Sequence, residues 1–149
     1  LSNDVTATLN CLKVLGTSYE YDLENKCIKL FKSTPLNEEL NSLESGSTLR
    51  FMIPLSIVKQ NCVTFTAAKR LMERGLGIYE EIFDNQGIKY LKTDTSIKIS
   101  GALKPGYFKV LGNVSSQFIS GLLFVAPLLK CFLCFNYTLK KQKNKAIFL

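Results

Sequence analysis

The chain has 149 residues and a hydrophobic fraction of 46%, which suits one globular domain with a core and excludes a disordered chain. Its net charge of +7 is uneven: the last twenty residues carry five lysines and no acid, a charge of +5. The first 129 residues carry 14 basic and 12 acidic side chains, a charge of only +2. We therefore expect no nucleic-acid-binding face outside the C-terminal segment.

The cysteine and histidine content limits the chemistry available. The chain has five cysteines and no histidine. An odd number of cysteines, scattered mostly through apolar runs, predicts buried free thiols and a cytoplasmic location. Cys131 and Cys134 form a C-x-x-C pair, but no second pair or histidine accompanies it, so we expect no metal and no cofactor. Ser-His-Asp and Cys-His catalysis is excluded, and the sequence identifies no catalytic residue.

Targeting and membrane signals are weak. The polar opening residues 1–4 predict no secretory signal, and the apolar run 118–129 is too short to span a bilayer before Lys130. We expect no membrane partner. Membrane contact by the lysine-rich segment 140–145 is a weaker alternative, because its basic and apolar residues do not separate onto one helical face.

The expected elements begin with a helix that starts at Ser2 or Asn3 and ends at Gly16. A hairpin follows, with strands at residues 19–23 and 27–31. A polar loop at residues 33–42 then leads to a second helix at about residues 46–58. Within the second helix, Pro54 should kink it or shorten its regular part.

The rest of the chain predicts short strands between helices. The expected strands are 62–66, 88–91, 96–100 and 107–111; the expected helices are 78–86 and one after Ser115. A β-α-β-β order recurs, which predicts an α/β fold built from a repeated motif. The last twenty residues lack caps and clean periodicity, so we expect a frayed extension.

Three polar segments precede or open helices and suit anions. Gly46, in the first, allows a ligand to approach the backbone closely. The second, residues 69–75, holds three cations, although a solvated charged loop is the alternative. Ser115, Ser116 and Gln117 form the third, where ordinary N-capping by Ser115 is the alternative. Together they indicate a substrate with more than one phosphate or carboxylate.

Four runs then carry a specific resemblance. They are Ser-Asn-Asp-Val near the start, Ser-Gly-Ser-Thr-Leu-Arg-Phe at 45–51, Val-Thr-Phe-Thr followed by Arg-Leu-Met-Glu-Arg at 70–74, and Val-Ser-Ser-Gln-Phe-Ile-Ser-Gly-Leu-Leu at 114–123. In this order they resemble the 5-enolpyruvylshikimate-3-phosphate (EPSP) synthase family over residues 2–129. The resemblance implies enolpyruvyl transfer from phosphoenolpyruvate to shikimate 3-phosphate, in aromatic amino acid biosynthesis.

The family also implies an architecture. Its two domains are each an inside-out α/β barrel of repeated βαβαββ units. On this basis residues 1–129 are an incomplete first domain, and residues 130–149 are an atypical basic and hydrophobic tail. The domain that brings acid and base groups has no counterpart here, so we expect the isolated chain to be inactive.

Matched position by position, the family implies the roles of five residues. Ser115 and Ser116 hold the shikimate phosphate, Gln117 lies near both substrates, and Gly46 and Arg74 bind phosphoenolpyruvate.

Departures from the family pattern leave alternatives. Arg50, at the end of the first motif, is given a supporting role. Gly75 stands where the family usually has proline, and Ala68 where glycine is common. A related enolpyruvyl transferase acting on UDP-N-acetylglucosamine is one alternative, although its reactive cysteine loop has no match. A non-catalytic remnant and a basic-tailed interaction protein are the others.

Overall fold

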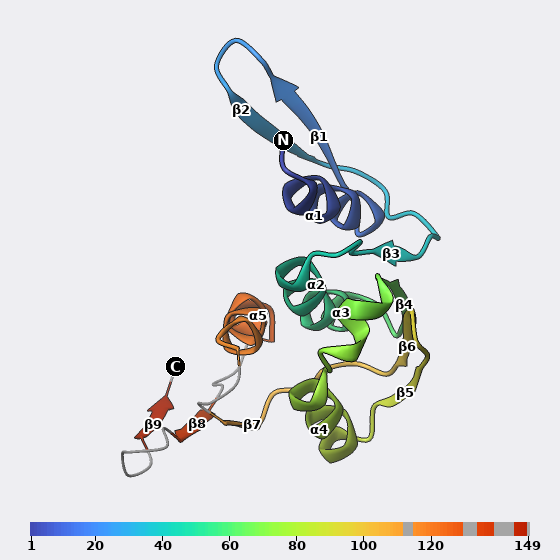
Figure 1. The fold of residues 1–149 in the computed structure, drawn as a ribbon. Coiled ribbons are helices and arrows are strands. Elements are labelled where there is room, and N and C mark those ends of the chain that lie inside the picture. The colour runs from blue at the N-terminus through green and yellow to red at the C-terminus, as the bar shows by residue number, and fades with distance from the viewer. Residues whose placement is uncertain (112–114, 130–133, 139–144, 149) are drawn as a thin grey trace.

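The computed structural model describes residues 1–111, 115–129, 134–138 and 145–148 (Figure 1). In chain order its elements are α1 (Asn3–Val14), β1 (Thr17–Asp22), β2 (Cys27–Lys32), β3 (Leu40–Asn41), α2 (Gly46–Lys59), β4 (Cys62–Thr66), α3 (Lys69–Glu73), α4 (Gly77–Gln86), β5 (Lys89–Lys92), β6 (Ser96–Ser100), β7 (Tyr107–Leu111), α5 (Gln117–Val125), a 3₁₀ turn (Ala126–Leu129), β8 (Cys134–Thr138) and β9 (Lys145–Phe148).

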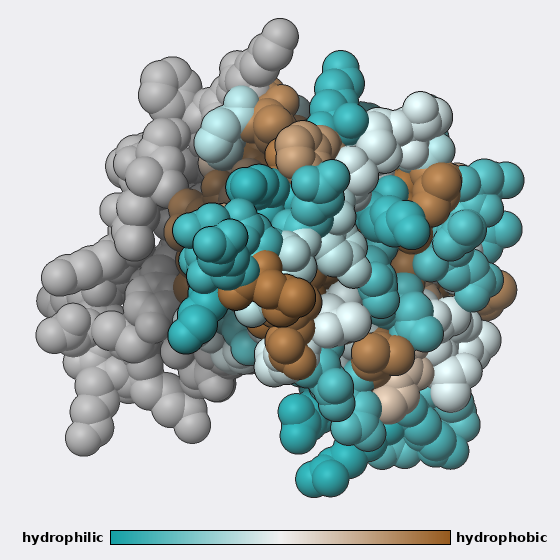
Figure 2. Space-filling model, turned by 90° about the horizontal axis from the view of Figure 1, so that it is seen from above, coloured by the Kyte–Doolittle hydropathy of each residue, from teal (hydrophilic) through white to brown (hydrophobic). Residues whose placement is uncertain are grey.

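The N-terminal elements follow the local signals in the sequence. The Ser2 hydroxyl accepts the N–H of Val5 at 3.3 Å and caps α1, and Gly16 leaves the helix with a φ of +92°. The antiparallel hairpin β1–β2 follows and projects beyond α1 (Figure 1). Seen from the hairpin end, the surface is mixed, with separate hydrophobic groups among hydrophilic side chains (Figure 2).

A four-stranded sheet with the order β3-β4-β6-β5 forms the middle of the molecule. Strand β3 pairs in parallel with β4 through two residues only, and the other pairs are antiparallel. From β3 to β6 the chain runs β-α-β-α-β-β, with α3 and α4 together in the second helical place. The elements α1-β1-β2 have the order of the end of such a unit, and β7-α5 that of its start. The α/β class is therefore confirmed, and the order of the elements is consistent with a repeated motif.

The hydrophobic core lies between this sheet and the helices. Helix α5 packs against α2 (Figure 1). Both helices bury apolar side chains. The most deeply buried members are Phe65, Ile97 and Ile99 from the sheet, Leu49, Ile53 and Ile57 from α2, and Leu122 and Val125 from α5. Burial of these two helices fixes where their N-terminal turns lie.

Two local predictions are wrong, and one of the two alternative effects expected of Pro54, a shortened helix, is not observed. Residues 69–73 form helix α3 rather than a loop, because Leu71 and Met72 are buried and give the charged segment an apolar side. Leu40, expected in a loop, is buried and forms β3 with its neighbour. Helix α2 is not shortened by Pro54 but continues to its end at Lys59; the compensating contact is described below.

The expected frayed extension is also wrong where the structure describes it. Strand β8 pairs in parallel with β7, and β9 pairs antiparallel with β8. Aromatic and β-branched residues in both strands favour this pairing. Cys131 and the lysines at 130, 140, 141 and 143 lie outside the described residues.

Burial is described for Cys11, Cys27 and Cys62, and among these the prediction of a buried thiol is confirmed for Cys11. Cys11 is buried, and burial raises its pKa to about 12. Cys27 and Cys62 are free but exposed, because strand ends place them at the surface. Among the described residues, no helix combines the length and apolarity that crossing a membrane requires.

Candidate functional site

Hydroxyl groups fix the first turn of α2. The Ser45 oxygen accepts the N–H of Thr48 at 3.3 Å and the Thr48 hydroxyl at 2.8 Å. Thr48 Oγ1 also lies 2.7 Å from Thr8 Oγ1, which ties the turn to α1. Ser45 Oγ is 3.2 Å from Ser47 Oγ. Either of the Ser45 and Ser47 hydroxyls can be the donor in this hydrogen bond, which extends the chain of hydroxyls to Ser47.

Gly46, Arg50 and Gln117 meet where α2 and α5 begin. Arg50 Nη1 donates to Gln117 Oε1 at 2.9 Å and to the Gly46 carbonyl at 3.4 Å. A Cβ on Gly46 would lie 2.8 Å from Arg50 Nη1 and 3.8 Å from Gln117 Oε1. The close approach that the sequence predicts at Gly46 is therefore made by a guanidinium of the chain itself.

Arg50 is buried at the centre of this cluster. Only 8% of the residue is exposed, and its guanidinium lies 4.9 Å from the centre of the Phe118 ring. Its Nε is buried without a hydrogen-bond partner among the described residues. Burial lowers the pKa of Arg50; Tyr79 acts in the opposite direction, and the positive charge of Arg74 lowers it further. Arg50 stays charged at neutral pH and holds the side-chain oxygen of Gln117 in place.

Tyr79 explains why α2 tolerates a proline. Pro54 has no N–H, so the carbonyl of Arg50, four residues earlier, loses its partner within the helix. The Tyr79 hydroxyl donates to that carbonyl at 2.5 Å. The Phe118 carbonyl lies 3.4 Å from the same hydroxyl, and burial raises the pKa of Tyr79. One buried side chain from α4 thus joins α2 to α5 beside the cluster.

The first turn of α5 carries the predicted pair of serines. The Ser115 hydroxyl accepts the N–H of Gln117 at 3.4 Å, which is a long capping bond. Ser116 already has helical dihedral angles, with φ of −57° and ψ of −17°, and its hydroxyl makes no hydrogen bond among the described residues. Both serines are exposed. Ser115 therefore acts as a cap, while the Ser116 hydroxyl stays available to a ligand.

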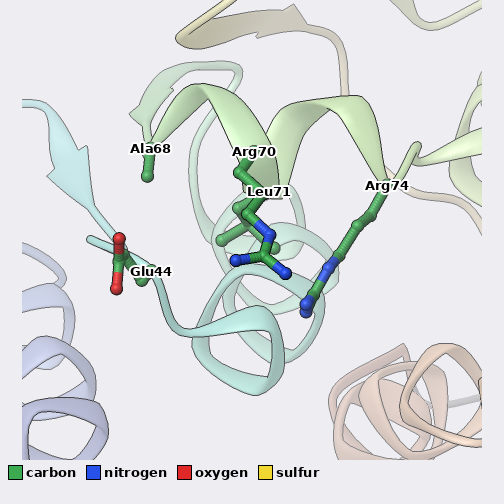
Figure 3. A pocket seen from close by; sticks show the side chains of 5 residues that line it. All are labelled: Glu44, Ala68, Arg70, Leu71 and Arg74. Carbon is green, nitrogen blue, oxygen red and sulfur yellow. The ribbon is translucent and has the colours of Figure 1, made fainter.

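A pocket of about 160 Å³ lies next to this cluster (Figure 3). Its lining residues are Glu44, Ala68, Arg70, Leu71 and Arg74. Arg74 follows α3 directly, and the next residue, Gly75, has a φ of +79°. Proline cannot adopt that angle, so the departure at Gly75 is built into this turn. The Leu71 side chain lies 3.5 Å from a Cβ placed on Gly46 and so connects the pocket to the cluster.

Comparison with known proteins identifies the family to which these features belong. Residues 1–131 match the family model described as EPSP synthase (3-phosphoshikimate 1-carboxyvinyltransferase). The chain belongs to the EPSP synthase family. A 3-phosphoshikimate 1-carboxyvinyltransferase of Clostridium botulinum (strain Eklund 17B / Type B) is 43% identical over 137 residues, covering 87% of this chain and 32% of the relative. One from Clostridium perfringens (strain SM101 / Type A) is 43% identical over 134 residues, covering 87% and 31%. The chain thus spans about a third of the length of these relatives.

Solved structures support the same fold. An EPSP synthase from Acinetobacter baumannii matches with a TM-score of 0.75, covering 96% of this chain and 34% of that structure, at 17% identity. At this identity the match concerns the fold alone. It agrees with the order of helices and strands and does not by itself assign residues.

The structure brings some of the predicted site residues together and places further residues beside them. Gly46 and Gln117 share the cluster, and Arg74 lies at its edge through Leu71. No contact joins the Ser115 and Ser116 side chains to Arg74 among the described residues. Sequence reasoning missed the hydroxyl chain, the central place of Arg50, and Tyr79. The one signal in the sequence was Pro54, which indicates that the Arg50 carbonyl needs a hydrogen-bond donor from outside α2.

Proposed function

We propose that this chain is part of a 3-phosphoshikimate 1-carboxyvinyltransferase, which transfers enolpyruvyl from phosphoenolpyruvate to shikimate 3-phosphate. The observation that supports it best is the meeting of Gly46, Arg50 and Gln117 beside a pocket lined by arginines. Hydroxyl, amide and guanidinium donors at this place suit substrates that carry phosphate and carboxylate groups.

The architecture is part of the proposal. Residues 1–129 are a partial first domain, and residues 130–149 are an atypical basic and hydrophobic tail that lies almost entirely outside the family match. Completed by further βαβαββ units, the domain would close as an inside-out α/β barrel. The β-α-β-α-β-β order from β3 to β6 supports this proposal, and so does the extent of the family match.

Each predicted residue has a role that its geometry permits. Ser115, Ser116 and Gln117 hold shikimate 3-phosphate at the start of α5, where the free Ser116 hydroxyl and the helix N-terminus favour an anion. Gly46, Arg74 and Gln117 bind phosphoenolpyruvate. Arg50 orients Gln117 between the two ligands through its 2.9 Å hydrogen bond. The Ser-Ser-Gln run favours this activity over transfer to UDP-N-acetylglucosamine.

The reaction itself needs more than binding. The shikimate 5-hydroxyl loses a proton and adds to C2 of phosphoenolpyruvate, while C3 gains a proton. The resulting intermediate then releases phosphate and loses a proton from C3, which restores the enol ether. This chain would supply substrate-binding groups, and the acid and base groups would come from the rest of the protein.

Calorimetry tests the shikimate 3-phosphate site. In the purified chain, Ser116→Ala should weaken shikimate 3-phosphate binding by about 1–3 kcal/mol, because a charged acceptor loses its donor. Ser18→Ala, in the distant hairpin, is the control. Circular dichroism first establishes that the variants are folded. Unchanged affinity for both Ser115→Ala and Ser116→Ala would rule out this site.

A further inference from the structure

The pocket beside the cluster contains two arginines where the family pattern assigns a ligand to one. Arg70 and Arg74 are four residues apart on α3 and its last turn, a spacing that places them on one face. Figure 3 shows both side chains extending the same way, alongside each other, over the first turn of α2. Both line the pocket, and both residues are exposed.

Neither Arg70 nor Arg74 forms an ion pair within the described part of the chain. The ion pairs among the described residues are Lys29–Asp22, Lys69–Asp94 and Lys92–Glu80. Lys69 is adjacent to Arg70 in sequence, but its ammonium lies 2.8 Å from Asp94. Like charges one helical turn apart repel each other, and the charge of Arg74 also acts on Arg50. A bound anion would relieve this repulsion.

The one acidic residue in the pocket lining does not fill this role. Glu44 lines the pocket but makes no ion pair with either arginine. In Figure 3 its carboxylate lies apart from both guanidinium groups, across the mouth of the pocket. Because it repels an anion, Glu44 favours placement of a ligand on the side of Arg70 and Arg74.

We propose that Arg70 is a second anion-binding residue, which with Arg74 clamps a small ligand bearing two acidic groups. Each guanidinium presents a planar fork that can bind a carboxylate or a phosphate through two hydrogen bonds. The pocket, of about 160 Å³, leaves room for a small acid phosphate beside the two guanidinium groups. The inference rests on the proposed function and assigns to Arg70 one of the two acidic ends of phosphoenolpyruvate.

Titration of the purified chain with phosphoenolpyruvate and with inorganic phosphate tests this clamp. Arg70→Gln should lower affinity for phosphoenolpyruvate about tenfold and affinity for inorganic phosphate less than about threefold, because only the first has two acidic ends. Arg70→Lys should give most of the same loss, since a point charge replaces a fork. Lys69→Gln is the matched control: it removes one positive charge from the adjacent position and should change neither affinity by more than about twofold.

The outcomes separate the clamp from the proposed function. Equal losses for Arg70→Gln and Lys69→Gln, or full affinity in Arg70→Lys, would show a general charge effect and overturn the clamp. A loss for Arg74→Gln with none for Arg70→Gln would overturn the clamp and leave the proposed function standing. No detectable binding of phosphoenolpyruvate to the unchanged, folded chain would overturn both.

Discussion

At the scale of single residues, Tyr79 carries the strongest structural prediction. Its hydroxyl is the partner of a carbonyl that Pro54 leaves without one inside α2. Tyr79→Phe keeps the ring and removes that donor, so the buried Arg50 carbonyl becomes unpaired. We expect the free energy of unfolding to fall by about 1–3 kcal/mol, measured by urea denaturation.

A second tyrosine supplies the control for this substitution. Tyr21 is 42% exposed on β1, so Tyr21→Phe should change stability by less than about 0.5 kcal/mol. If Tyr79→Phe is equally neutral, another group satisfies the Arg50 carbonyl and α4 does not support the cluster. Sequence reasoning could not find this contact, because Tyr79 looks like an ordinary core position of an amphipathic helix and its partner is 29 residues away.

At the scale of elements, Gly121 sets how closely α5 approaches α2. A Cβ there would overlap the Arg50 carbonyl and lie 2.5 Å from the Tyr79 hydroxyl. The carbonyl belongs to the backbone and cannot turn away. We therefore expect Gly121→Ala to destabilise the chain by about 1–3 kcal/mol, although alanine favours a helix by about 1 kcal/mol over glycine.

Gly77 is the matched glycine for this test. It also lies in a helix, at the start of α4, but a Cβ there would meet nothing within 4 Å. Gly77→Ala should leave the thermal midpoint unchanged or raise it slightly. A Gly121→Ala variant as stable as Gly77→Ala would mean that the two helices do not pack at this distance.

The β1–β2 hairpin gives a pH-dependent prediction. The Asp22 carboxylate accepts hydrogen bonds from the side chain and backbone of Asn25 and from Lys29, each at 3.0 Å. In that order these bonds lower its pKa from 3.8 to about 2. Because the folded pKa lies below the unfolded one, the contribution is complete above about pH 4 and is lost as the pH falls towards 2.

Proton NMR of the hairpin amides can detect this loss. Between pH 4 and 2 we expect the protection factor of the Asn25 amide, which is its exchange rate relative to the intrinsic rate at the same pH, to fall. Asp22→Asn should remove that part of the pH dependence, whereas Glu24→Gln, on the same turn, should retain it. An unchanged profile in Asp22→Asn would contradict the assignment.

The elements differ in how far local sequence determines them. Helix α1 and the hairpin were predictable because Ser2 and Gly16 mark their limits within a few residues. Helix α3 was not, since five residues make fewer than two helical turns and cannot show a repeated period, and its helical state depends on burial of Leu71. Strand β8 depends on pairing with β7, which lies more than twenty residues earlier, and β9 in turn pairs with β8. Such distant pairings leave no local signal.

At the scale of the whole molecule, the candidate site was predictable as a set of segments but not as an arrangement. The polar runs at Gly46 and Ser115–Gln117 were visible, as were the charges before Gly75. Their contact through Arg50 and Gln117 joins residues 67 positions apart and follows from the packing of α5 on α2. Arg50 was given only a supporting role, because burial of its guanidinium beside Phe118 is a property of the assembled helices.

Catalysis also depends on the groups that the whole molecule supplies, and we predict that this chain alone does not catalyse the transfer. Proton delivery to C3, removal from the hydroxyl and assistance to the leaving phosphate each need a positioned acid or base, worth about 10²–10⁴-fold per group. The chain has no histidine. Ser115, Ser116 and Arg74 are exposed, so these binding groups of the described part do not exclude water from the substrates.

Phosphate release from the purified chain, with both substrates present, measures this directly. We expect release no faster than without protein, and we expect no growth of cells that lack the synthase when only these 149 residues are expressed. A full-length relative provides the positive control in both assays. Because the chain spans about a third of such relatives, binding without turnover is the result that fits a substrate-holding part of the enzyme. Clear turnover would instead require an acid and a base within this chain, and Glu44, which lines the pocket, would be the first residue to replace.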